Sequence, residues 1–153
     1  MSSHSSKQNK HAEEYIVEEI RKEFGIKEWC HEYKDLLNVD FDFYYSQDDQ
    51  NIVGEVYCSA GKLSSGSRRK LMNDAAKMVA IEKLSGKNFQ KFLILTDNEL
   101  LRSSYSVEGN WRKRVIEEVF GITVRFEKLP AKMVEDLITS HKKQSQAAKG
   151  REG

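Results

Sequence analysis

Four segments of the chain carry the signals of helices. In residues 11–24 the apolar positions recur three and four residues apart, charged residues lie off that face, and Gly25 follows as a stop. Residues 108–120 repeat this amphipathic pattern, with Trp111 among the apolar positions that are expected to be buried. The other predicted helices are residues 67–84, with Ser67 as N-cap, and residues 130–141, opened by Pro130.

Strict alternation of apolar and polar residues predicts a β-hairpin. Residues 39–45 alternate cleanly, residues 46–51 are polar and form the turn, and residues 52–58 form the returning strand. If Tyr45 pairs with Ile52 across this turn, the carboxylates Asp42 and Glu55 lie opposite one another. The register of a longer turn is not fixed by its sequence, so Asp40 stays an alternative to Asp42.

Two further strands complete the α/β pattern. Residues 92–96 form a continuous apolar run, as expected for a strand covered on both faces, and residues 122–126 form the last strand. Strand–helix–strand succession implies parallel pairing with right-handed crossovers, so we expect a mixed central sheet flanked by helices on both faces. The expected organisation is one domain, residues 11–141, with disordered polar tails at 1–10 and 142–153.

Charge is unevenly distributed along the 153 residues, although the net charge is only +1. Residues 35–58 contain six acids and no Lys or Arg, whereas residues 61–91 contain eight bases and two acids. An acidic segment followed by a basic one is typical of a cation-holding site beside an anion-binding surface. Ordinary charge scatter in a protein with 32% charged residues is the alternative.

Several classes of protein are excluded by the same sequence. No apolar run approaches the roughly 18–20 residues that a membrane span needs, and the polar N-terminus does not have the pattern of a signal peptide. The two cysteines, Cys30 and Cys58, have neither metal-site nor disulfide-framework spacing, which suggests a reducing cytoplasm. The four histidines are scattered, which argues against a zinc site.

The hairpin is the first candidate for chemistry. Carboxylates on one face of neighbouring strands repel one another, and strands disfavour Asp. A divalent cation removes this penalty, because carboxylates are the oxygen ligands that Mg²⁺ takes. The sequence therefore predicts metal ligands among Asp40, Asp42 and Glu55, with a solvated outer face as the alternative.

The helix predicted at 67–84 is the second candidate. Lys70, Asn73, Asp74 and Lys77 recur at spacings of three and four and form one polar stripe. The next positions on this stripe are apolar, so the stripe indicates a polar pocket near the start of the helix. A surface ion pair between Lys70 and Asp74 is the alternative.

Together these residues carry a resemblance to a known family. Asp40 or Asp42 on one strand, then Gly54-Glu55-Val56-Tyr57 on the next, a helix and an apolar strand are similar to the PD-(D/E)xK phosphodiesterase superfamily, the restriction-endonuclease-like nucleases. The resemblance covers residues 11–97. It implies that Asp40 or Asp42 and Glu55 hold Mg²⁺ or Mn²⁺, and that Glu14 or Glu18 matches an extra acid that some members use.

The resemblance departs from the family at the motif lysine, where this chain has Tyr57. Some members place the lysine on the following helix, so Lys70 or Lys77 is the expected replacement. The implied function is a metal-dependent endonuclease that hydrolyses phosphodiester bonds of DNA, with no role for a membrane. Many nucleases that the chain resembles cut as dimers, so the resemblance leaves a homodimer open. Its expected contacts to the DNA backbone are Lys62, Arg68 and Arg69. The alternative is a catalytically inactive nuclease-like domain that binds nucleic acid or a protein partner.

Overall fold

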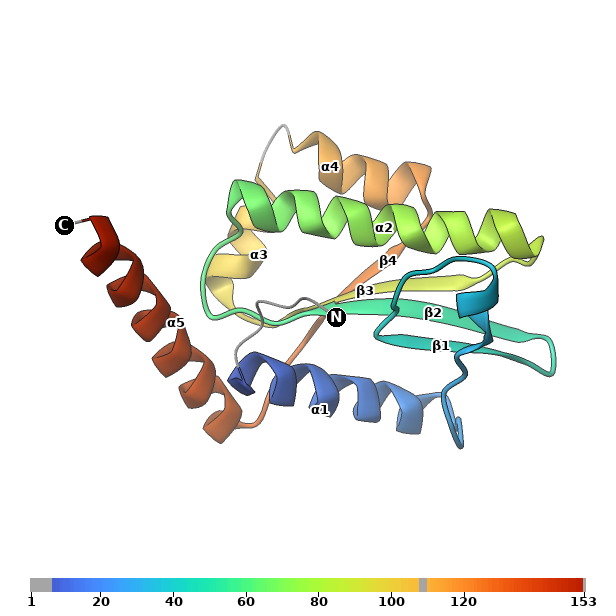
Figure 1. Ribbon diagram of the computed structural model, residues 1–153, viewed down its shortest axis with the longest axis horizontal. Helices are drawn as coiled ribbons and strands as arrows, with labels where there is room; N and C mark the ends of the chain where they lie inside the picture. Colours follow the sequence, from blue (N-terminus) through green and yellow to red (C-terminus); the bar gives the residue numbers. More distant parts are fainter. Residues whose placement is uncertain (1–6, 108–109, 153) are drawn as a thin grey trace.

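The computed structural model describes residues 7–107 and 110–152, with side chains described up to residue 143 (Figure 1). Its elements in chain order are α1 (Lys7–Glu23), the 3-10 turn η1 (Glu32–Asp35), β1 (Phe43–Gln47), β2 (Gln50–Tyr57), α2 (Ser65–Ser85), β3 (Gln90–Thr96), α3 (Glu99–Tyr105), α4 (Trp111–Arg114), the π-helical turn η2 (Val115–Val119), β4 (Thr123–Glu127) and α5 (Ala131–Glu152). The chain therefore has the mixed α/β fold that the sequence predicts.

The strands form one mixed sheet in the order β1-β2-β3-β4. β1 and β2 are antiparallel, while β3 runs parallel to both β2 and β4. In the hairpin Tyr45 pairs with Ile52, as expected. The turn is shorter than the predicted 46–51, because Asp48 and Asp49 both have positive φ angles (53° and 63°) and close a two-residue connection.

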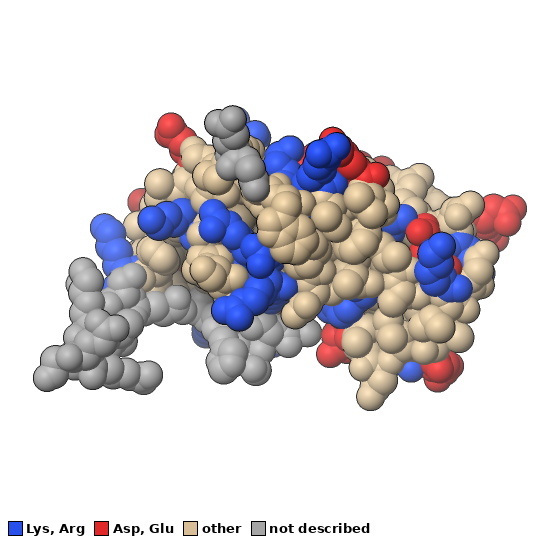
Figure 2. Space-filling view, turned by 90° about the horizontal axis from the view of Figure 1, so that it is seen from above, with Lys and Arg blue, Asp and Glu red and all other residues tan. Residues whose placement is uncertain are grey.

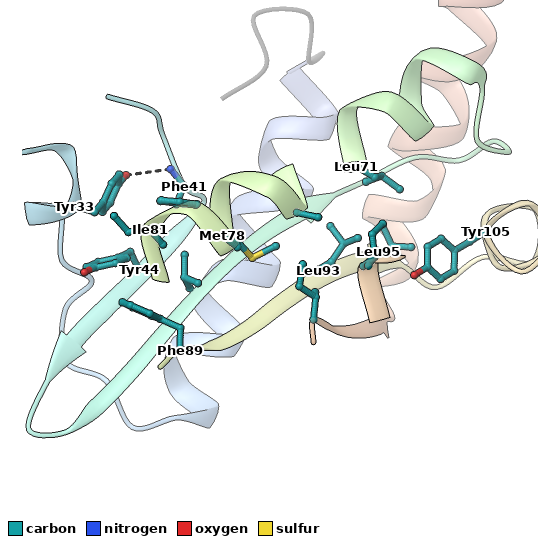
Figure 3. Close-up of a cluster of buried hydrophobic side chains, with 14 of the residues drawn as sticks. Tyr33, Phe41, Tyr44, Leu71, Met78, Ile81, Phe89, Leu93, Leu95 and Tyr105 are labelled. Atoms are coloured by element: carbon teal, nitrogen blue, oxygen red, sulfur yellow. Dashed lines mark hydrogen bonds between the residues drawn. The ribbon is translucent and has the colours of Figure 1, made fainter. Parts of the chain in front are cut away.

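Helices cover both faces of the sheet (Figure 1). On one face α1 packs with α5, and Ile16 and Ile20 are buried against Ile52 and Ile94 of the sheet. On the other face the buried side chains come mainly from α2 and the sheet (Figure 3). The sheet is thus the middle layer of three. A residue's position along a strand decides whether its side chain packs against α1 or against α2.

The start of β1 differs from the alternating pattern predicted over 39–45. The strand begins only at Phe43, and the irregular segment before it places Phe41 on the α2 side of the sheet, whereas Phe43 faces α1. The hydroxyl of Tyr33 accepts a hydrogen bond of 3.1 Å from the backbone N–H of Phe41 (Figure 3). This aromatic group fixes the chain just before the strand, and with it Asp42.

Helix boundaries also differ from those predicted. α2 begins at Ser65, because the hydroxyl of Ser64, and not that of Ser67, accepts the capping hydrogen bond. α3 is not predicted by the sequence pattern; its N-cap is Asn98, whose side chain accepts from the N–H of Leu101. α1 begins at Lys7, and α5 continues to Glu152, so both helices enter the stretches that were expected to be tails.

The predicted helix 108–120 is only partly as expected. Residues 108–109 lie outside the described residues, and the helical turns run from Trp111 to Val119. Ile116 is buried, but Trp111 and Val119 are 58% and 70% exposed, so the expectation that they are buried is wrong. The π-helical turn accounts for this difference, because it changes the spacing at which side chains return to the same face.

Both cysteines are buried and carry free thiols. In the part of the chain that the structure describes, no helix combines the length and the apolar character that crossing a membrane requires.

Candidate active site

Two carboxylates lie close together at the start of β1. Phe43 pairs with Gly54, so Asp42 and Glu55 are the next residues outward on the two chains. The Asp42 Oδ2 atom accepts a hydrogen bond of 2.7 Å from the N–H of Val56. The side chain of Glu55 is buried, and this burial together with the charge of Asp42 raises its pKa. Between Asp40 and Asp42, it is therefore Asp42 that joins Glu55.

Helix α2 brings two lysines to these acids. The Lys77 Nζ atom lies 2.8 Å from Glu55 Oε1 and 3.3 Å from Asp74 Oδ1, and it donates a hydrogen bond of 2.8 Å to the backbone carbonyl of Asp40. The Lys70 Nζ atom donates to Asp74 Oδ2 at 2.8 Å. Asp74 is only 7% exposed, so it is a buried acid between two partly exposed lysines, whereas Asn73 of the predicted stripe is exposed.

A third acid comes from α1, on the other side of the sheet. Glu13 is half-buried, and burial together with the charge of Asp42 raises the pKa of its carboxyl to about 7. The expected extra acids, Glu14 and Glu18, are exposed, and Glu18 pairs with Arg21. A signal for Glu13 exists in the sequence, because it precedes two buried isoleucines at the helical spacings of three and seven residues.

The six groups form what we call the acid–lysine cluster: Glu13, Asp42, Glu55, Lys70, Asp74 and Lys77. Fully ionised, its four carboxylates and two ammonium groups carry an excess of two negative charges. Burial, and then the charges of Asp42 and Asp74, raise the pKa of Glu55 well above its usual value. Burial opposes the charge of Lys77, but Glu55 and Asp74 keep the pKa of this lysine above its usual value. The cluster is thus built to attract positive charge.

The donor chemistry of the cluster fits a divalent cation. Carboxylate oxygens are the ligands of Mg²⁺ and Mn²⁺, and the neighbouring Asp42 and Glu55 carry them, with the charge of Asp42 reaching Glu13 of α1 as well. The buried Glu55 Oε1 atom receives no hydrogen bond of regular geometry, although Lys77 lies close to it. Within the described residues no three acids, histidines or cysteines stand in a ready-made metal arrangement, and the Lys77 ammonium occupies the space beside Glu55. A cation therefore requires Lys77 to move away from Glu55.

Other residues proposed from the sequence lie apart from these contacts. The carboxylate of Asp40 is exposed and pairs with Lys34 at 3.2 Å. Lys62 and Arg69 are exposed, whereas Arg68 donates a hydrogen bond of 3.2 Å to the carbonyl of Ser104. On the face seen in Figure 2, lysines and arginines gather over the end of the molecule where α2 begins.

Tyr57, the residue at the position where the resemblance would place a lysine, points to the start of α2. Its hydroxyl forms a hydrogen bond of 2.8 Å with the hydroxyl of Ser67. Tyr57 therefore supplies no cation to the cluster, and the positive charge beside Glu55 comes from Lys77.

Replacing Glu13 by Gln is expected to change how stability depends on pH. Because the pKa of Glu13 is raised by folding, ionisation of this group disfavours the folded state, and the protein loses stability as the pH rises from about 4.5 to about 7. Glu13→Gln removes this loss. In chelator, its free energy of unfolding relative to the wild type is expected to rise by about 2 kcal/mol between pH 4.5 and 8, measured by urea denaturation. A constant difference across this range would contradict the raised pKa.

Comparison with known proteins gives no relative for this chain. No protein-family model matches it, and neither a curated protein nor a solved structure matches it significantly.

Proposed function

We propose that this protein is a divalent-metal-dependent nuclease that hydrolyses phosphodiester bonds of DNA. The observation that carries the proposal is the pairing of Asp42 and Glu55 with Lys77 and Asp74 of α2 in one partly buried group, whose charges also act on the half-buried Glu13. Holding these acids together costs free energy, because burial and the charges of neighbouring carboxylates oppose the ionisation of Glu13 and Glu55. A group of residues that costs stability in this way is typical of a functional site.

Each member of the cluster has a part in this chemistry. Asp42 and Glu55, with Glu13 beside them, would hold the cation. A divalent cation at this place polarises the phosphate and lowers the pKa of a bound water. The Lys77 ammonium lies beside Glu55, from where it would stabilise the negative charge of a phosphate in the transition state. Asp74 holds Lys70 and Lys77 on the same side of the cluster.

The surface beside α2 supports an anionic substrate. The loop and first turns of α2 carry Lys62, Arg69 and Lys70, and the first two are exposed. Such residues bind DNA through its phosphates and give affinity without reading the sequence. The similarity to the PD-(D/E)xK arrangement, with its lysine moved to the helix, supports the same function.

Metal dependence is the direct test. The purified protein is incubated with supercoiled plasmid and with single-stranded DNA, in Mg²⁺ or Mn²⁺ and in excess EDTA. We expect nicked or shortened products with the metal and none with the chelator. Undiminished cleavage in EDTA would contradict the metal site.

An inactive nucleic-acid-binding domain is the second candidate, since Tyr57 has replaced the motif lysine. Absence of cleavage of both substrates, together with salt-sensitive DNA binding, would favour this candidate. The position of Lys77 beside Glu55 favours the nuclease, because α2 supplies the ammonium group that Tyr57 lacks.

A further inference from the structure

Trp111 is an exposed indole on the α2 side of the sheet. It is 58% exposed, and it is the one aromatic side chain among the large exposed apolar residues of the described chain. It lies at the start of α4, and the following turn packs on the same buried cluster as α2 through Ile116. Burying an indole is worth more free energy than burying most other side chains, so an indole in water is a candidate contact for a ligand.

The surroundings of Trp111 hold it in place. The Asn110 side chain accepts hydrogen bonds from the N–H groups of Arg112 and Lys113 and donates one of 2.8 Å to the carbonyl of Tyr105. The concave surface in front of α4 has a volume of about 520 Å³, and it is lined by Val107 and Trp111 together with the paired residues Lys113, Arg114, Glu117 and Glu118. The indole is therefore presented by a fixed turn and borders a hollow.

The charges beside Trp111 select the kind of ligand. Three basic residues follow it; Lys113 pairs with Glu117 at 3.0 Å and Arg114 pairs with Glu118 at 2.7 Å. Arg112 has no carboxylate within ion-pair distance in the described residues, and its guanidinium stacks 4.8 Å from the centre of the Trp111 ring. A cation without an acidic partner, stacked on an exposed indole, is complementary to a base that carries a phosphate.

We infer that Trp111 and Arg112 form a contact site for single-stranded nucleic acid, in which an unpaired base stacks on the indole and a phosphate meets the guanidinium. The inference rests on the proposed function for the nature of the substrate, and it adds unpaired nucleotides as the part of the substrate that α4 holds. Stacking needs a base that is free of its partner strand, so a fully paired duplex offers this site only its phosphates.

Fluorescence tests the site directly. The chain has two tryptophans, so Trp29→Phe leaves Trp111 as the only one. In this variant we expect oligothymidylate to quench the emission, and a fully paired duplex to leave it nearly unchanged. In the wild-type background, which needs no change at Trp29, Trp111→Ala is expected to weaken oligothymidylate binding about tenfold or more in a mobility-shift assay.

Matched variants distinguish the contribution of base stacking to binding from that of charge and from that of an exposed apolar surface. Arg112→Gln is expected to lower the slope of log affinity against log salt by about one. Leu100→Ala truncates an equally exposed apolar residue (57%) of α3 and is expected to bind like the wild type. Unchanged affinity in Trp111→Ala, or equal loss in Leu100→Ala, would overturn the inference.

The outcomes distinguish this inference from the nuclease proposal. Trp111-dependent binding without cleavage retains the contact site and rejects the nuclease. Metal-dependent cleavage together with unchanged oligothymidylate binding in Trp111→Ala retains the nuclease proposal and rejects the contact site. A sedimentation shift from dimer to monomer in Trp111→Ala, with no quenching by oligothymidylate, would assign the indole to a protein interface and overturn the inference.

Discussion

Glu55→Gln is expected to lower metal-dependent DNA cleavage by about 10³-fold, because a cation at this site acts as a Lewis acid worth several kcal/mol in the transition state. Gln keeps the size of the side chain and removes the negative charge that attracts the cation. Glu55 is buried with a raised pKa, so the neutral amide is not expected to destabilise the fold. The measurement is the rate of plasmid nicking at saturating Mn²⁺, together with Mn²⁺ affinity by calorimetry.

Asp40→Asn is the matched control for this experiment. Asp40 belongs to the same acidic segment, but its carboxylate is exposed and pairs with Lys34. We therefore expect its cleavage rate to stay near that of the wild type. Equal losses in Asp40→Asn and Glu55→Gln would indicate a general effect of acidic charge and would contradict the assignment of Glu55 as a ligand.

Gly54→Ala is expected to destabilise the protein by about 3 kcal/mol. A Cβ atom at this position would lie 1.9 Å from the Phe43 Cζ atom, far inside contact distance. The Phe43 ring is 2% exposed and packs against Trp29 with ring centroids 5.1 Å apart, so it has little freedom to move. The midpoint of urea unfolding, followed by circular dichroism, measures the loss.

A double variant checks that this contact is the cause. Phe43→Leu shortens the opposing side chain, so Gly54→Ala in that background is expected to cost clearly less than it costs alone. Additive losses in the two backgrounds would show that the Phe43 ring is not what excludes a side chain at Gly54. Because Glu55 follows directly, this close packing also fixes the strand that carries the central acid.

Much of the fold was predictable from periodicity alone. The alternating hairpin and the apolar run of β3 have patterns that arise from local geometry, and the structure has the Tyr45–Ile52 pairing that was one of the registers open to the hairpin. This register brings Asp42 to Glu55. The helical spacing of Lys70, Asp74 and Lys77 places these three cluster residues on one face of α2. These features depend on residues close together in the chain or directly paired across strands.

The remaining parts depend on packing between distant segments. Glu13 is affected by Asp42 because α1 packs on the sheet near the start of β1, and a sequence pattern within α1 does not contain that information. Trp111 occupies an apolar position of the periodic helical pattern, but the π-helical turn changes which side chains share a face, and Trp111 is exposed. Asp40 and Asp42 were equivalent until Tyr33 fixed the irregular segment before the strand.

All six groups of the acid–lysine cluster come from residues 13–77, whereas the inferred nucleotide contact lies on α4. The two parts share a buried layer but no side chain of the cluster. Substitutions on the exposed surface of α4 can therefore accumulate without touching the acid–lysine cluster. In evolutionary terms, the proposed chemistry and the inferred contact are free to change independently of one another.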